Sequence, residues 1–112
     1  MRPRTSVVSR FPSQSRLFHH YQHALVRALP LSFSNCVTMG ERPVIDMQKA
    51  SEQHKAYVQM LRKLVPHVYE IPADHNQPDC CFIEDTAVLA DNLAIMTHMG
   101  HASRRNEVSP TL

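Results

Sequence analysis

Hydrophobic residues recur along this chain at spacings that predict one long helix. From Asp46 onward the apolar side chains fall three and four residues apart, as on one face of an α-helix, and the pattern ends before Pro66. Asp46 is a suitable N-cap, because its carboxylate can accept a hydrogen bond from the first turn. The predicted buried stripe consists of Met47, Ala50, His54, Tyr57, Leu61 and Leu64. The opposite face is charged, which is typical of a solvated helix surface rather than a binding patch.

Shorter apolar runs predict four strands around this helix. Residues 23–29 form the first run, which ends at Pro30 and places Arg27 at its exposed or functional end. Residues 68–71 follow the helix, and the runs 81–89 and 93–97 flank three turn-forming residues, which predicts a hairpin. The order of elements predicts an α/β unit.

The segment between the first strand and the helix has the composition of a lid-like loop. Residues 31–43 mix serine, asparagine, glycine and proline with apolar Phe33, Val37 and Met39. This irregular pattern fits no core element, and loops that expose apolar residues often cover ligands.

Two adjacent carboxylates, Glu84 and Asp85, interrupt the apolar run 81–89, and Asp79 stands just before it. An ionised carboxylate is costly to bury unless it meets a cation or hydrogen-bond donors. A guanidinium, planar and rich in donors, suits such a cluster. Two explanations stay open: ion pairs with Arg27 or Arg104 that only hold the fold together, or a site for a cationic ligand.

Length and composition indicate one small globular domain, with 112 residues of which 43% are hydrophobic. Two glycines leave no phosphate-binding glycine motif, so nucleotide binding is not expected. Residues 1–17 are rich in arginine and serine and contain no acid, which predicts a disordered extension, an organelle-targeting segment or a misassigned start. No apolar run approaches the ~20 residues of a membrane span. The expected location is cytoplasmic, with mitochondria as the alternative.

The cysteines and histidines do not form a recognisable metal site. Cys36, Cys80 and Cys81 are odd in number and lack a Cys-x-x-Cys spacing, so neither a disulfide framework nor a zinc centre is expected. They are better interpreted as small core residues. His98 and His101 are three residues apart but match no full ligand set. No metal and no cofactor is expected.

Several segments, in order and spacing, resemble dimethylarginine dimethylaminohydrolases over about residues 18–108. The segments are His23–Pro30, Gln53–Tyr57, Ile71-Pro72-Ala73-Asp74, Pro78-Asp79-Cys80 running into Phe82-Ile83-Glu84-Asp85, and Arg104-Arg105 between Ser103 and Glu107-Val108. The resemblance implies the pentein fold, a five-bladed α/β propeller of ββαβ units. Residues 18–112 would then supply the first blade and the start of the next, so the chain looks truncated.

The resemblance also implies a function in arginine metabolism and nitric oxide signalling. The family hydrolyses Nω-methylated arginines to citrulline and a methylamine through a cysteine nucleophile, with a histidine as general acid and base. Asp79, Glu84 and Asp85 would contact or position the substrate guanidinium, and Arg104 would hold the substrate carboxylate. The family's nucleophile and histidine have no counterpart in these 112 residues. The chain by itself is therefore expected to be inactive.

The expected partner is a small molecule, a methylated arginine, rather than nucleic acid or a membrane. Exposed sheet edges also predict self-association. Two alternatives stay open: a non-catalytic fragment that binds guanidinium groups or another protein, and a different guanidine-modifying hydrolase such as an arginine deiminase.

Overall fold

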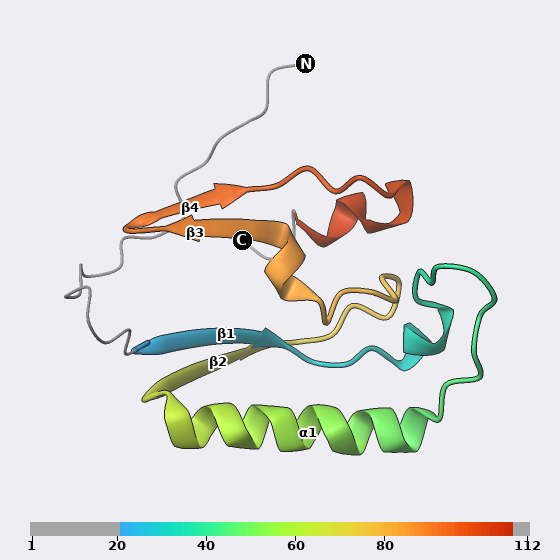
Figure 1. The fold of residues 1–112 in the computed structure, drawn as a ribbon, viewed down its shortest axis with the longest axis horizontal. Helices are drawn as coiled ribbons and strands as arrows, with labels where there is room; N and C mark the ends of the chain where they lie inside the picture. Colours follow the sequence, from blue (N-terminus) through green and yellow to red (C-terminus); the bar gives the residue numbers. More distant parts are fainter. Residues whose placement is uncertain (1–20, 109–112) are drawn as a thin grey trace. The chain divides into compact units, whose positions relative to one another are not determined.

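The computed structural model describes residues 21–108, which divide into two compact units, residues 21–81 and residues 82–108. The basic segment 1–17, and the boundary predicted at residue 18, lie outside the described residues. The helix and strands are β1 (His23–Arg27), α1 (Met47–Leu64), β2 (His67–Ile71), β3 (Ala87–Ala90) and β4 (Leu93–Met96) (Figure 1). The predicted order of strand, loop, helix and three strands is confirmed. Within residues 21–108, no helix has the length and apolar character needed to cross a membrane.

In the first unit, β1 and β2 pair in parallel, and α1 is the connection that a parallel pair requires (Figure 1). Glu70 of β2 lies 3.5 Å from Arg62 of α1, so this side of the sheet faces the helix. Val26 is the register partner of Glu70 and therefore lies on the same side, where it is buried. The opposite side carries the alternate residues of both strands.

The helix begins and ends as predicted, and four of the six residues of the predicted buried stripe, Met47, Ala50, His54 and Leu61, are half-buried. The Asp46 carboxylate accepts a hydrogen bond from the Lys49 backbone N–H at 3.0 Å, and the last helical residue is Leu64. Tyr57 and Leu64, predicted to be buried, are 58% and 71% exposed, whereas Val58 is buried. The prediction was wrong for Tyr57 and Leu64, because the two-stranded sheet of the first unit leaves their part of the helix surface uncovered.

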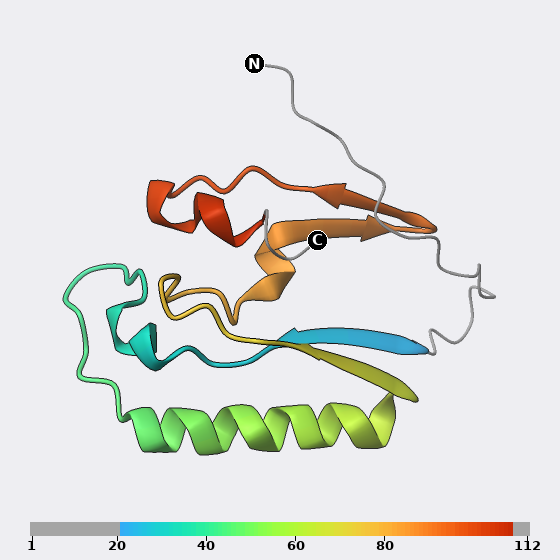
Figure 2. The same cartoon turned by 180° about the vertical axis from the view of Figure 1, so that it is seen from behind.

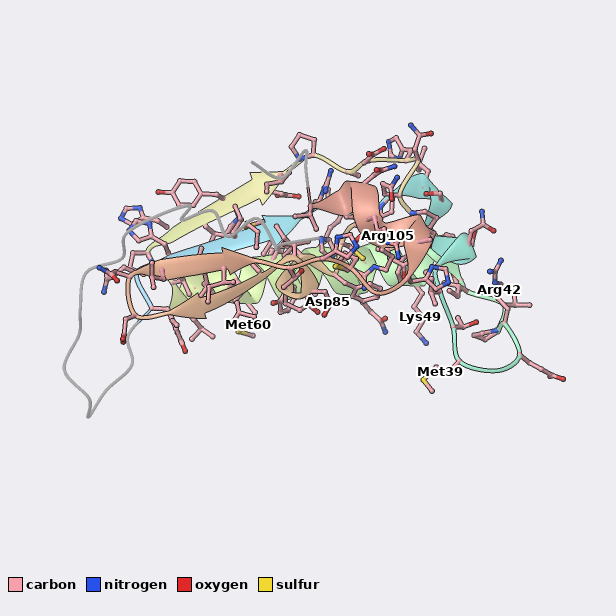
Figure 3. All side chains as sticks on the ribbon, turned by 90° about the horizontal axis from the view of Figure 1, so that it is seen from above. Met39, Arg42, Lys49, Met60, Asp85 and Arg105 are labelled. Carbon is pink, nitrogen blue, oxygen red and sulfur yellow. The ribbon has the colours of Figure 1, made fainter. Side chains whose placement is uncertain are left out.

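Two features of the first unit correct the predictions for β1 and the following loop. β1 ends at Arg27, and the Arg27 side chain is buried rather than exposed, with its Nε donating to the Pro72 carbonyl at 3.0 Å. The segment predicted to be irregular contains a 3₁₀ helix, Leu31–Asn35. Cys36 follows and is buried, and residues 39–44 are exposed: Met39 and Arg42 extend from the loop that leads into α1 (Figure 3).

In the second unit the predicted strand 81–89 is wrong over its first half. Ile83–Thr86 forms a 3₁₀ helix, and β3 begins only at Ala87. Local hydrogen bonds explain the difference, because the Asp85 N–H donates to the Phe82 carbonyl and the Thr86 hydroxyl donates to the Ile83 carbonyl at 2.7 Å. Glu84 and Asp85 therefore lie on a turn of helix and not in a strand.

The predicted hairpin is confirmed, with a shorter connection than expected. β3 and β4 pair antiparallel in register Ala87 to Met96, and they lie side by side in both ribbon views (Figure 2). The connection is the two residues Asp91 and Asn92. Asp91 has a φ of 52°, in the left-handed region that aspartate tolerates better than most residues.

Replacing Asp46 with alanine tests the cap of α1. The N–H groups of the first turn lose their acceptor, and we expect the free energy of unfolding to fall by about 1 kcal/mol, as for other capping residues. Urea unfolding followed by circular dichroism measures the change. Asp46→Asn retains an acceptor oxygen and should stay within a few tenths of a kcal/mol of the parent. Equal losses in the two variants would show that the cap contributes nothing.

Candidate functional site

Arg104 is the centre of a charged cluster in the second unit. It lies in a 3₁₀ helix, Ala102–Glu107, that follows β4. Its Nε donates to Glu107 Oε2 at 3.1 Å, and Nη2 donates to the same oxygen at 2.9 Å. Nη1 donates to Asp85 Oδ2 at 2.8 Å. One guanidinium thus joins two carboxylates that are 22 positions apart in the sequence.

Burial makes the contact with Glu107 the more demanding of the two ion pairs. The Glu107 side chain is 1% exposed, whereas the Asp85 side chain is 50% exposed. A buried carboxylate needs its partner because an uncompensated charge away from water is strongly destabilising. Burial acts to lower the pKa of Arg104, but hydrogen bonds to Glu107 and Asp85 outweigh it and raise the pKa above its usual value. Arg104 therefore stays charged at every pH at which a protein is normally studied.

The hairpin fixes the backbone that carries Asp85. The Thr97 hydroxyl donates to the Asp85 carbonyl at 2.6 Å, and the Thr97 N–H donates to the Thr86 carbonyl at 3.0 Å. The guanidinium of Arg104 also lies over the Phe82 ring, 5.9 Å from the ring centre. These contacts hold the 3₁₀ helix Ile83–Thr86 against the segment that follows β4. The half-exposed carboxylate of Asp85 therefore lies next to Arg104.

The structure brings together two of the four predicted site residues. Asp85 and Arg104 form an ion pair, as the structural explanation of the acidic segment also predicted. Glu84 is exposed, and no ion pair joins it to another residue of the described segment 21–108. Asp79 belongs to the first unit. Arg27, the other predicted partner, also lies in the first unit and donates to Pro72.

Asp79 fastens the lid-like loop within the first unit. The carboxylate is buried, and both of its oxygens accept from the Val37 N–H at 3.1 Å. Val37 immediately follows the buried Cys36, so the acid fixes the point where the exposed part of the loop begins. The buried end of the loop is therefore held by Asp79, whereas residues 39–44 are exposed.

Sequence reasoning missed Glu107 as a member of the site. Its position three residues after Arg104 was visible, and residues three apart in a helical turn face each other. The signal is weak, because charged pairs at this spacing are common on exposed helices. Nothing in the local sequence shows that Glu107 is buried.

The cysteines behave as core residues. All three are free thiols; Cys36 and Cys80 are buried, and Cys81 is half-buried. Burial, and next the negative charge of Asp79, raise the pKa of the Cys36 thiol. The described residues contain no group of three histidine, cysteine or acidic side chains placed to hold a metal ion.

Two curated proteins that are similar to this chain in sequence carry the same enzyme name. No family model matches the chain. It is 32% identical over 87 residues to the N(G),N(G)-dimethylarginine dimethylaminohydrolase of Pseudomonas aeruginosa, and 37% identical over 87 residues to that of Streptomyces coelicolor. These alignments cover 78% and 77% of this chain and 34% of each relative. The chain therefore spans about a third of the length of these curated relatives.

Solved structures give the same answer for the fold. A cysteine-to-serine mutant of the Pseudomonas aeruginosa enzyme, complexed with citrulline, matches with a TM-score of 0.75 and 32% identity, over 80% of this chain and 35% of that one. This chain is similar to the N-terminal portion of dimethylarginine dimethylaminohydrolase. A histidine-to-glycine variant of a dimethylarginine dimethylaminohydrolase, an adduct with S-methyl-L-thiocitrulline, matches with a TM-score of 0.75 and 31% identity over the same shares. The mixed α/β fold is therefore that of dimethylarginine dimethylaminohydrolases over the matched residues.

Replacing Glu107 with glutamine tests the buried ion pair. The substitution leaves Arg104 without its main counter-charge, and we expect the free energy of unfolding to fall by about 3 kcal/mol, the scale for breaking a buried pair. Glu84→Gln is the matched control, because Glu84 is an exposed acid of the same unit and should change stability by less than about 0.5 kcal/mol. Urea denaturation of both variants gives the comparison. A loss of less than about 1 kcal/mol in Glu107→Gln would contradict the role given to Glu107.

Thiol labelling tests the placement of the cysteines. At pH 8 under native conditions we expect iodoacetamide to modify Cys81 first and Cys36 slowly, because Cys36 is buried and its raised pKa keeps the thiol protonated. Mass spectrometry of peptides identifies the labelled positions. The preference for the neutral thiol stabilises the fold at low pH and is lost as the pH rises through the Cys36 pKa. Equal labelling of Cys36 and Cys81 in the folded protein would contradict this arrangement.

Proposed function

We propose that this chain supplies part of the substrate site of a methylarginine hydrolase. The observation that carries the proposal is the Asp85–Arg104 ion pair, with a half-exposed acid, in a chain that matches dimethylarginine dimethylaminohydrolases in sequence and fold. In the solved structures those relatives hold citrulline or S-methyl-L-thiocitrulline. Both molecules carry the charged amino-acid group of arginine.

The charges of the cluster complement such a ligand. A methylated arginine has a carboxylate at one end and a guanidinium at the other, so it can lie beside the pair with its carboxylate toward Arg104 and its guanidinium toward Asp85. The Nε and Nη2 atoms of Arg104 donate to the buried Glu107, and Nη1 donates to the half-exposed Asp85, so a ligand carboxylate would share or replace the Asp85 contact and leave the Glu107 contact in place. Glu84, exposed on the same turn, adds negative charge for the guanidinium.

Hydrolysis needs chemistry that this cluster does not supply. The C–N bond between the guanidinium carbon and the methylated nitrogen breaks, the amine leaves with a proton, and water provides the oxygen of citrulline. In the proposed reaction a cysteine thiolate attacks the guanidinium carbon and a histidine transfers the protons. Glu84, Asp85 and Arg104 orient the substrate and stabilise its charge. The 112-residue chain is proposed to bind methylarginine without converting it.

The fold proposal follows from the same match. The helix-connected parallel pair and the hairpin would form the first blade and the start of the second blade of a five-bladed propeller. The match over 80% of the chain, with a TM-score of 0.75, supports this assignment.

Calorimetric titration of the chain with asymmetric dimethylarginine tests the proposal. We expect weak binding that Asp85→Asn reduces about tenfold, since a charge-assisted contact of about 1.4 kcal/mol corresponds to that factor. Asp91→Asn is the control, because Asp91 is an exposed acid of the same unit at the hairpin turn. Arginine titrated in parallel distinguishes a general guanidinium site from one that prefers the methylated form.

A citrulline assay on the same samples tests the second half of the proposal. The expected result is no citrulline above the uncatalysed background. Citrulline formation by the purified chain would overturn the assignment of a binding role without catalysis. Absence of binding, or equal binding by the parent and Asp85→Asn, would overturn the substrate-site assignment.

A further inference from the structure

Two histidines lie side by side on the face of the first unit's sheet that is turned away from α1. His23 and His67 are register partners in the parallel pair of β1 and β2, and they alternate with the helix-facing positions of Val26 and Glu70. Both histidines are exposed. Their ring centres are 5.0 Å apart, and the ring planes are inclined by 21°. The sequence does not reveal this pair, because 44 positions separate the two residues.

Tyr69 supports one of the two rings. Its hydroxyl oxygen lies 3.3 Å from Nδ1 of His23, and its ring is nearly parallel to that of His23, with the ring centres 5.9 Å apart. In the tautomer of His23 that donates this hydrogen bond, Nδ1 carries the proton and Nε2 carries the lone pair. Histidines that bind metal ions usually have this arrangement, with one nitrogen on the metal and the other donating to a neighbouring group.

We propose that His23 and His67 together bind a divalent transition-metal ion of the class that includes Zn²⁺. Imidazole nitrogen is a preferred ligand of these ions. Two nitrogens that each lie about 2.1 Å from a tetrahedral ion are roughly 3.4 Å from each other. Neighbouring strands about 4.8 Å apart bring paired side chains within that reach, and rotation about the soft χ2 torsions directs one nitrogen of each ring toward the same ion.

The number of ligands sets the strength of this site. Among residues 21–108, no group of three histidine, cysteine or acidic side chains is placed to hold a metal ion, so the two histidines bind it with water completing the coordination. The site is therefore open and exchangeable, unlike the closed four-ligand zinc sites that stabilise folds. The proposal does not depend on methylarginine binding, since neither histidine belongs to the Asp85–Arg104 cluster.

Titration of ¹⁵N-histidine-labelled protein with Zn²⁺, followed by NMR, tests the proposal. At about pH 7.5, where an ordinary imidazole is largely neutral, we expect the ring nitrogens of His23 and His67 to shift together with one midpoint. His67→Gln should weaken the response of His23 more than about tenfold, and Tyr69→Phe, which removes only the supporting hydrogen bond, should weaken it about tenfold. His98→Gln is the matched control, an exposed histidine of the second unit, and should leave the midpoint unchanged. Circular dichroism verifies that each variant is folded.

Three outcomes would overturn the proposal. They are ring nitrogens of His23 and His67 that do not shift in excess Zn²⁺, shifts of the two rings with different midpoints, and a folded His67→Gln variant in which His23 responds as it does in the parent. Methylarginine titration of His67→Gln keeps this proposal separate from the proposed function, because methylarginine binding should be unchanged where Zn²⁺ binding is lost.

Discussion

The buried carboxylate of Glu107 is the constraint on which the second unit depends. A charge held away from water at 1% exposure requires a fixed partner, and Arg104 provides it with two donor nitrogens. The same guanidinium reaches Asp85, whose backbone carbonyl accepts from Thr97 after β4. One buried pair therefore connects the two 3₁₀ helices and the hairpin of a unit that has little apolar core of its own.

This arrangement is compatible with both explanations of the acidic segment, the structural one and the proposed substrate site. Nε and Nη2 of Arg104 donate to the buried Glu107, and this contact stabilises the fold. Nη1 donates to Asp85, whose side chain is half-exposed. A ligand with charges of both signs can exchange contacts with Asp85 and Arg104 without breaking the buried pair. Preorganisation of this kind lowers the cost of ordering a binding group, because the guanidinium is already fixed.

Much of the fold was predictable from the sequence, because the signals were local. The helix followed from its apolar spacing, the Asp46 cap and Pro66, and the hairpin followed from two β-prone runs around Asp91 and Asn92. The errors arose where distant packing, or local hydrogen bonds that the apolar pattern does not reveal, decides the structure. Tyr57 and Leu64 are exposed because the sheet is narrow, and the start of the run 81–89 is helical because Thr86 and Asp85 make local hydrogen bonds. The candidate site was also predicted only in part. The Asp85–Arg104 ion pair was one of the pairs that the sequence suggested. The burial of Glu107 and the hydrogen bonds from Val37 to Asp79 depend on tertiary contacts and were not predicted.

NMR of the arginine Nε–H groups tests most directly whether the fixed Arg104 guanidinium also receives the ligand. In ¹⁵N-arginine-labelled protein the account predicts slow exchange with solvent at Arg104 and at Arg27, which donates to Pro72 within the first unit. On addition of dimethylarginine the Arg104 resonance should shift and the Arg27 resonance should not. Rapid exchange at Arg104, or a resonance that does not move at ligand concentrations where binding is complete, would contradict the account.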